Sequence, residues 1–103
     1  MRRPALGTQL VTFYAGINYG IPFQAVEGDD GPCDGEGYGL PELEGLNGNI
    51  GGVSSYIISN DCNDQVYYYE EDYEGDRTSN LNDCTWVGER WNDHLYSMAL
   101  WHS

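Results

Sequence analysis

Two stretches of the chain share one pattern, in which alternating apolar and aromatic positions run into a polar turn. The first reads VTFYAGINYG at residues 11–20, and the second reads VYYYEEDYEG at residues 66–75. In each, the turn carries Asn or Asp directly followed by Tyr. Alternation with a period of two predicts a β-strand, and Asn or Asp is typical of the turn that ends one. The chain therefore repeats a strand-and-turn unit.

Each unit is followed by a loop and a second apolar segment that contains Ser. These segments are GGVSSYII at residues 51–58 and DHLYSMAL at residues 93–100. We therefore read residues 1–103 as one domain with two related halves, about 8–60 and 64–103. Tyr14 to Ser55 spans 41 residues and Tyr68 to Ser97 spans 29, so the first half is longer by 12. We place this excess in the acidic, Gly-rich segment 27–45 and expect a loop insertion there, not regular strand.

The composition favours an all-β sandwich or barrel of short strands. Nine Tyr, three Trp and two Phe favour strands, and 14 Gly together with many Asn and Asp favour frequent turns. The run of Tyr67, Tyr68 and Tyr69 is interpreted as strand, with Tyr68 facing inward and its neighbours outward. The chain has no apolar run long enough to span a bilayer and no visible signal peptide, so we expect no membrane partner.

The charge balance is strongly acidic. Seventeen Asp and Glu stand against four Arg and no Lys, for a net charge of -13. Such a surface repels phosphates, which excludes a nucleic acid partner. The acidity has two interpretations: solubility or adaptation to high salt, or cation binding, since a bound divalent ion would relieve self-repulsion.

The cysteines are Cys33, Cys62 and Cys84. An odd number allows at most one internal disulfide and leaves one free thiol, and the pairing stays open at this point. The spacing is not that of a zinc site, and His94 and His102 do not complete one. A disulfide would favour a secreted or extracellular location.

No catalytic motif is present. The chain lacks a Gly-x-Ser-x-Gly elbow, a His-Glu-x-x-His motif and a phosphate-binding loop, and nothing singles out a pair of carboxylates. An EF-hand frame that starts at Asp30 fails because Pro32 and Pro41 stand at ligand positions 3 and 12. We therefore expect a protein that is not an enzyme.

The paired halves resemble the βγ-crystallin domain, in which two Greek key motifs form a small β-sandwich. The first strand and hairpin of each such motif follow the pattern aromatic-Tyr-x-x-x-Asn-aromatic-x-Gly. The second half matches at Tyr67, Tyr68, Asp72, Tyr73 and Gly75, and the first half matches at Phe13, Tyr14, Asn18 and Tyr19. Ile21 stands where the first hairpin should have Gly, and Gly20 precedes it, so we expect that hairpin to be shifted by one residue.

Calcium-binding members of this family carry Asn/Asp-Asn/Asp-x-x-Ser/Thr-Ser in each half. The second loop, NDHLYS at 92–97, keeps the acidic pair but has Tyr96 at the fifth position. The first loop, IGGVSS at 50–55, keeps Ser54 and Ser55 but has lost the acidic pair. The two defects are complementary, because in the family the two loops lie side by side and exchange ligands.

The resemblance implies one working calcium site. Its ligands would be the carbonyls of Ala15 and Gly52, the hydroxyl of Ser54 and the carboxylate of Asp93. Oxygen ligands of this kind suit Ca²⁺, and a single carboxylate predicts a weak dissociation constant of roughly 10⁻⁵ to 10⁻³ M. The alternatives are that Ser54 and Ser55 only bond their own loop and that Asp93 is an ordinary turn residue.

A second site would use the carbonyls of Tyr69 and His94, a carboxylate at position 51 and a short hydroxyl at position 96. Position 51 is Gly and position 96 is Tyr, so this site is read as lost. The acidic stretch 70–76 is interpreted as a solvated hairpin, with a loose cation site as the alternative.

Three hypotheses follow. The first is a monomeric calcium-binding domain whose ion stabilises the fold. The second is a non-catalytic secreted interaction protein of the same fold, toxin-like or protease inhibitor-like, that contacts a protein partner through the 27–45 loop. The third is a salt-adapted domain whose acidity serves hydration alone.

Overall fold

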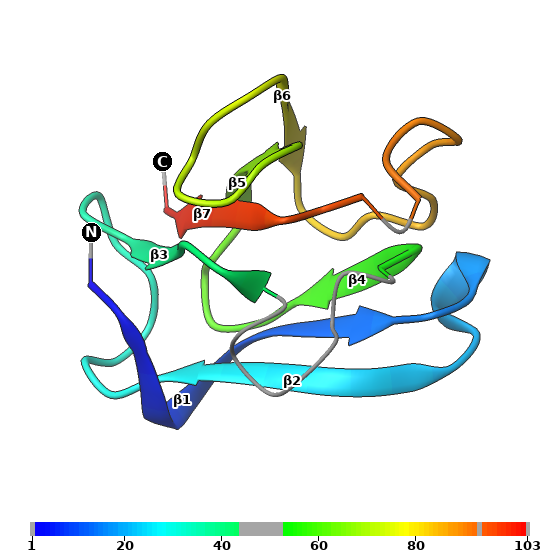
Figure 1. Ribbon diagram of the computed structural model, residues 1–103. Coiled ribbons are helices and arrows are strands. Elements are labelled where there is room, and N and C mark those ends of the chain that lie inside the picture. Colours follow the sequence, from blue (N-terminus) through cyan, green and yellow to red (C-terminus); the bar gives the residue numbers. More distant parts are fainter. Residues whose placement is uncertain (1, 44–52, 93, 103) are drawn as a thin grey trace.

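The computed structural model describes residues 2–43, 53–92 and 94–102, and it shows two antiparallel sheets stacked face to face (Figure 1). One sheet has the order β2-β1-β4 and the other has the order β3-β7-β5-β6. The first sheet consists of β1 (Pro4–Tyr14), β2 (Pro22–Gly28) and β4 (Ser55–Ile58). The second consists of β3 (Tyr38–Leu40), β5 (Asp64–Tyr68), β6 (Arg77–Leu81) and β7 (Ser97–Trp101). The predicted all-β sandwich is confirmed.

The two halves of the chain exchange their third strands. β3 belongs to the first half by sequence, yet it pairs with β7 of the second half, with Gly39 opposite Ala99. In return, Cys84 of the second half bridges Tyr56 in β4 and exchanges two backbone hydrogen bonds with it. Each sheet therefore contains residues of both halves, which brings their loops together.

The core fills the space between the two sheets. Tyr56 from the first sheet packs edge to face against both Phe13 of its own sheet and Tyr67 of the second. The larger fully buried apolar side chains include Leu10, Leu40, Leu43, Leu95, Met98 and Leu100. None of the helical residues in the described part of the chain forms a helix that is long and apolar enough to cross a membrane.

The predicted orientation of the tyrosine run is wrong by one residue. Tyr67 is the inward side chain, at 4% exposure, and Tyr68 is half-buried on the other side of β5. Gln65 sets this register, because it is buried and holds the Tyr56 hydroxyl. Tyr68 instead packs against Tyr73, with ring centroids 5.7 Å apart. Alternation determines which residues share a face, but it does not determine which face is buried.

The two hairpins have the same unusual backbone conformation. Each turn places two consecutive residues at positive φ, which Asn and Asp tolerate better than most residues. The residues and φ values are Asn18 at 53° and Tyr19 at 61° in the first hairpin, and Asp72 at 55° and Tyr73 at 62° in the second. The first of these turns lies in the short 3-10 segment η1 (Ile17–Tyr19). The resemblance between the two stretches is thus also a resemblance of backbone geometry.

The first hairpin closes one residue earlier than the second. The Ala15 amide donates to the Ile21 carbonyl at 2.8 Å, whereas the Tyr69 amide donates to Asp76, also at 2.8 Å. Gly75 has a φ of 74°, as the family pattern requires, but Gly20 has a φ of -66°. The expected one-residue shift is therefore present, although Gly20 does not supply a positive φ.

The segment 27–45 contains regular strand, contrary to the prediction, because β3 lies within it and completes the second sheet. Equivalent hydrogen bonds locate the inserted residues: Asn18 N donates to Thr85 O, and Asp72 N donates to Pro41 O. Asn18 to Pro41 spans 23 residues and Asp72 to Thr85 spans 13, so ten of the 12 extra residues precede the third strand. They include the acidic loop, defined as residues 29–37.

A disulfide joins Cys33 in the acidic loop to Cys62 before β5. Cys84 is the free thiol, and it is buried. Burial raises its pKa, so the group stays a neutral thiol at physiological pH. Three pairings were open from the sequence, and the strand exchange selects this one by placing Cys84 against β4.

Candidate cation site and acidic loop

Ser55, at the sixth position of the first loop, locks the first hairpin. Its hydroxyl donates to the Gly16 carbonyl at 2.6 Å and accepts from the Tyr19 amide at 3.1 Å. The side chain is fully buried. Ser55 therefore has the structural role that the sequence left open, which is to bond the backbone of a turn at positive φ.

Ser97 does the same in the second half. Its hydroxyl donates to the Glu70 carbonyl at 2.6 Å and accepts from the Tyr73 amide at 3.0 Å. Both sixth-position serines therefore use their hydroxyl groups to hold the backbone of a hairpin turn.

Ser54, at the fifth position, has a different environment. Its backbone amide donates to Tyr14 O at 2.9 Å, and its carbonyl accepts from the Val87 amide at 2.9 Å. Its hydroxyl lies 2.9 Å from the Ala15 carbonyl oxygen and 2.5 Å from Asn92 Oδ1. Ser54 is only 4% exposed. Three oxygens from three separate segments thus converge in a nearly buried position.

The structure brings together two of the four predicted ligands, Ala15 and Ser54. Gly52 and Asp93 lie outside the described residues. Asn92 contacts the Ser54 hydroxyl, although the sequence did not predict it as a site residue. It was visible as the first member of the acidic pair, but sequence alone does not tell which member of a pair faces a neighbouring loop.

The fifth position of the second half carries Tyr96 in the same backbone arrangement. Its amide donates to Tyr68 O at 3.1 Å, as Ser54 does to Tyr14. Its side chain is long, and the hydroxyl lies 3.1 Å from His94 Nδ1. The short hydroxyl that would face the Tyr69 carbonyl is therefore replaced by a ring and a distant phenol oxygen.

Aromatic rings surround this position. Tyr69 stacks on His94 with centroids 5.3 Å apart and 24° between the planes, and it meets Trp91 edge to face at 5.5 Å. The Arg90 guanidinium lies over Tyr69, 5.3 Å from the ring centroid. The second half therefore has a packed aromatic cluster and a cation–π contact where the first half has a group of oxygens.

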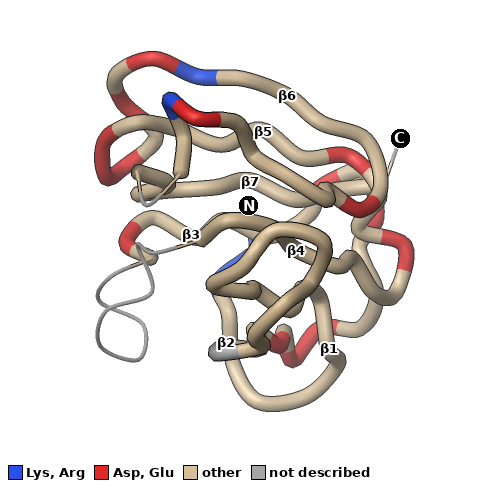
Figure 2. The backbone as a smooth tube through the Cα atoms, turned by 90° about the vertical axis from the view of Figure 1, so that its right-hand side faces the viewer, with Lys and Arg blue, Asp and Glu red and all other residues tan. Residues whose placement is uncertain are grey.

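The acidic side chains are dispersed. Figure 2 shows Asp and Glu along the loops around both sheets and Arg at few positions. The described residues contain no group of three or more His, Cys, Asp or Glu that could hold a metal ion. A cation at Ser54 would therefore depend on neutral oxygens in addition to any carboxylate.

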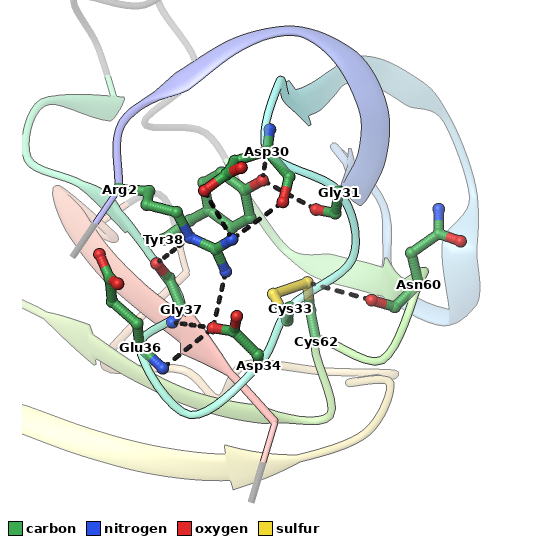
Figure 3. Close-up of polar contacts among 10 residues, drawn as sticks. All are labelled: Arg2, Asp30, Gly31, Cys33, Asp34, Glu36, Gly37, Tyr38, Asn60 and Cys62. Atoms are coloured by element: carbon green, nitrogen blue, oxygen red, sulfur yellow. Dashed lines mark hydrogen bonds and ion pairs between the residues drawn. A yellow bond between two sulfur atoms is a disulfide. The ribbon is translucent and has the colours of Figure 1, made fainter.

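The acidic loop is held by a cation of the chain itself, the Arg2 guanidinium (Figure 3). It forms ion pairs with Asp30 at 3.1 Å and Asp34 at 2.8 Å, and it lies 4.4 Å from the centroid of the Tyr38 ring. The Arg2 side chain is only 14% exposed. Its backbone also bridges Tyr38, so this residue continues the edge of the second sheet beside β3.

Asp34 organises the tip of the acidic loop. Its Oδ1 accepts from the amides of Gly37 at 3.2 Å and Glu36 at 3.0 Å, in addition to Arg2. The backbone hydrogen bond from Gly37, followed by that from Glu36 and the charge of Arg2, lowers the pKa of Asp34. The carboxylate is therefore held in its charged form.

No protein-family model matches the chain, and no curated protein matches it either. Solved structures do match over most of its length. A βγ-crystallin domain from Clostridium beijerinckii has 25% identity and a TM-score of 0.63, and the match covers 91% of this chain and 99% of that one. One from Flavobacterium johnsoniae has 20% identity and a TM-score of 0.64, with 91% and 96% covered. The N-terminal domain of protein S has 15% identity and a TM-score of 0.63, with 88% and 93% covered.

These likenesses agree with the internal evidence of paired sheets, exchanged third strands and two equivalent hairpins locked by serine. The protein is therefore a two-Greek-key domain of the βγ-crystallin fold.

Proposed function

We propose that this domain binds one calcium ion beside Ser54 and that the ion stabilises the fold in a non-catalytic role. The observation that supports this most strongly is the position of the Ser54 hydroxyl, which lies nearly buried between a backbone carbonyl and a side-chain amide oxygen. Hard oxygen donors of this kind suit Ca²⁺, which accepts carbonyls, hydroxyls and waters together.

The proposed ligand set is the one that the family resemblance implies. The 2.9 Å contact between the Ser54 hydroxyl and the Ala15 carbonyl oxygen supports the choice of these two ligands, and the Gly52 carbonyl and the Asp93 carboxylate are proposed to complete the set. With one carboxylate the site would be weak, roughly 10⁻⁵ to 10⁻³ M, which is the range of low-affinity sensors and extracellular modules. The Cys33–Cys62 disulfide is consistent with an extracellular location, which we propose for the same protein.

Binding would stabilise the domain because the ligands come from distant segments. Ala15 follows β1 and Ser54 precedes β4, while Asp93 stands four residues before the first residue of β7 in the sequence. At a free calcium concentration ten times the dissociation constant, the gain is about 1.4 kcal/mol. For a chain of this size, such a gain raises the melting temperature by roughly 5–10 °C.

Calcium titration calorimetry and thermal unfolding of EDTA-treated protein test the proposal. We expect one saturable site in the wild-type chain, loss of most binding in Asp93→Ala and weaker binding in Ser54→Ala. Ser79→Ala is the matched control, because Ser79 is exposed on β6 in the second sheet. Absence of calcium binding by the wild-type chain would contradict the proposal. An equal rise in melting temperature with KCl at matched ionic strength would favour salt adaptation instead.

The acidic loop supports a second candidate function, contact with a basic protein surface. Its Asp29 and Glu36 are exposed, while the disulfide and the ion pairs with Arg2 restrict its backbone. A pre-organised loop loses little entropy on binding. The test is the charge-reversed pair Asp29→Lys and Glu36→Lys, which should abolish partner binding while calcium binding stays unchanged.

A further inference from the structure

We propose that Asn92 is a direct ligand of the ion at Ser54, through its side-chain oxygen, and that it sets the affinity of the site. This inference rests on the proposed function and assigns an additional residue to the same site.

The first argument is a count of protons. The Ser54 hydroxyl has one hydrogen, but it faces two acceptor oxygens, Ala15 O at 2.9 Å and Asn92 Oδ1 at 2.5 Å. A hydroxyl can donate to only one of them at a time. With the Asn92 amide oriented so that Oδ1 faces the hydroxyl, the other contact joins two oxygen lone pairs at a distance typical of short hydrogen bonds. A cation among the three oxygens removes this conflict, because each oxygen can direct a lone pair to it.

The second argument is burial. Ser54 is 4% exposed, so solvent has little access to supply the missing donor. A buried polar contact without a proton between its oxygens is costly in a region of low dielectric constant. The same burial strengthens the attraction between oxygens and an ion.

The third argument is the way the backbone presents Asn92. The amides of Trp91 and Asn92 both donate to Gly88 O, at 3.1 and 2.9 Å, so a tight turn fixes the Asn92 backbone. Gly88 allows that turn with its φ of 102°. The neighbouring Val87 amide is bonded to Ser54 O at 2.9 Å. Backbone hydrogen bonds therefore hold the turn next to Ser54. They fix the position from which the Asn92 side chain reaches the Ser54 hydroxyl.

A neutral amide oxygen at this position has a clear consequence for affinity. It contributes a ligand without adding negative charge, and the affinity of calcium sites rises with the charge of their ligands. A carboxylate of the same shape would then bind the ion more tightly. The alternative is a rotated amide whose N–H₂ donates to Ser54, which would make Asn92 a positioning residue only.

Two variants separate these possibilities, measured by CaCl₂ calorimetry on EDTA-treated full-length protein. Asn92→Leu keeps the size but removes the oxygen, and we expect calcium binding to weaken about tenfold. Asn92→Asp keeps the oxygen and adds charge, and we expect binding about fivefold tighter or better. Asn63→Ala, which removes an amide before β5, should leave the affinity unchanged. Melting temperatures in EDTA show whether each variant is folded.

The outcomes are distinguishable. Unchanged affinity in Asn92→Leu, with Ser54→Ala still weakened, would overturn the role of Asn92 and leave the calcium site intact. Weaker binding in both Asn92→Asp and Asn92→Leu would show that the amide N–H₂ is required and would also overturn the ligand assignment. If the wild-type chain binds no calcium, the proposed function fails and this inference fails with it. Should Asn92→Leu not fold, the Asn92→Asp result alone decides between an oxygen ligand and an N–H donor.

Discussion

Ser54 and Tyr96 occupy equivalent positions in the two halves, with the same backbone hydrogen bond to the preceding hairpin and very different side chains. Their neighbours Ser55 and Ser97 make the same pair of hydrogen bonds, to within 0.1 Å. The comparison separates two roles that adjacent serines have in one motif. The sixth position holds the hairpin and is the same in both halves, whereas the fifth position faces the neighbouring loop and differs.

The physical reason lies in what each side chain satisfies. Ser55 and Ser97 each satisfy one amide and one carbonyl of a turn at positive φ, and without them these partly buried backbone groups would lose their hydrogen-bond partner. The side chain at the fifth position does not pair both an amide and a carbonyl of a turn. This position can carry a hydroxyl among oxygens, as Ser54 does, or a ring in an aromatic cluster, as Tyr96 does.

The largest expected effect comes from the sixth position. Ser55→Ala and Ser97→Ala should each lower the free energy of unfolding by about 2–3 kcal/mol, because each leaves two backbone groups unpaired. Urea unfolding in EDTA measures this loss, with Ser79→Ala as the exposed control. A large loss in one half and none in the other would show that the two hairpins are not equivalent.

A smaller effect is expected at the fifth position of the second half. Tyr96→Ser should cost about 1.5 kcal/mol through lost aromatic contacts with Tyr69, and it should not create a second calcium site on its own. Adding Gly51→Asp should create that site, so calorimetry should count two ions. A double variant that still binds a single ion would contradict the exchange of ligands between the loops.

The smallest effect is a pH dependence confined to the acidic loop, which the second half lacks. The pKa of Asp34 is lowered in the folded state, so its contribution to stability is present above its ordinary pKa of about 3.9 and is lost as the pH falls further. Asp34→Asn should flatten this acid limb of the unfolding curve. Arg2→Ala should keep most of it, because the Gly37 amide is the main cause of the lowered pKa.

Asp29→Asn is the control for this experiment, since Asp29 is an exposed carboxylate of the same loop. If Arg2→Ala flattens the acid limb as much as Asp34→Asn does, the ion pair and not the backbone governs the titration.

Local chemistry made several features predictable from the sequence. Asn18-Tyr19 and Asp72-Tyr73 predict turns, because few residues tolerate positive φ. The alternation of apolar and polar positions predicts the strands around them. Ala15 and Ser54 could be paired only through the family resemblance, and the structure does bring them together. Asn92 could not be identified in the same way, because a side chain that reaches across from another loop leaves no periodic signal.

The sequence by itself determined the repeat, the two hairpins and the all-β character, because each of these depends on residues close together in the chain. Tertiary structure alone decided the rest. Whether Tyr67 or Tyr68 is buried depends on how the sheets face each other, and the pairing of Cys33 with Cys62 depends on the exchange of third strands. The contacts of Arg2 with the acidic loop, 28 and 32 residues away, and of Asn92 with Ser54, 38 residues away, exist only because the fold brings distant segments together.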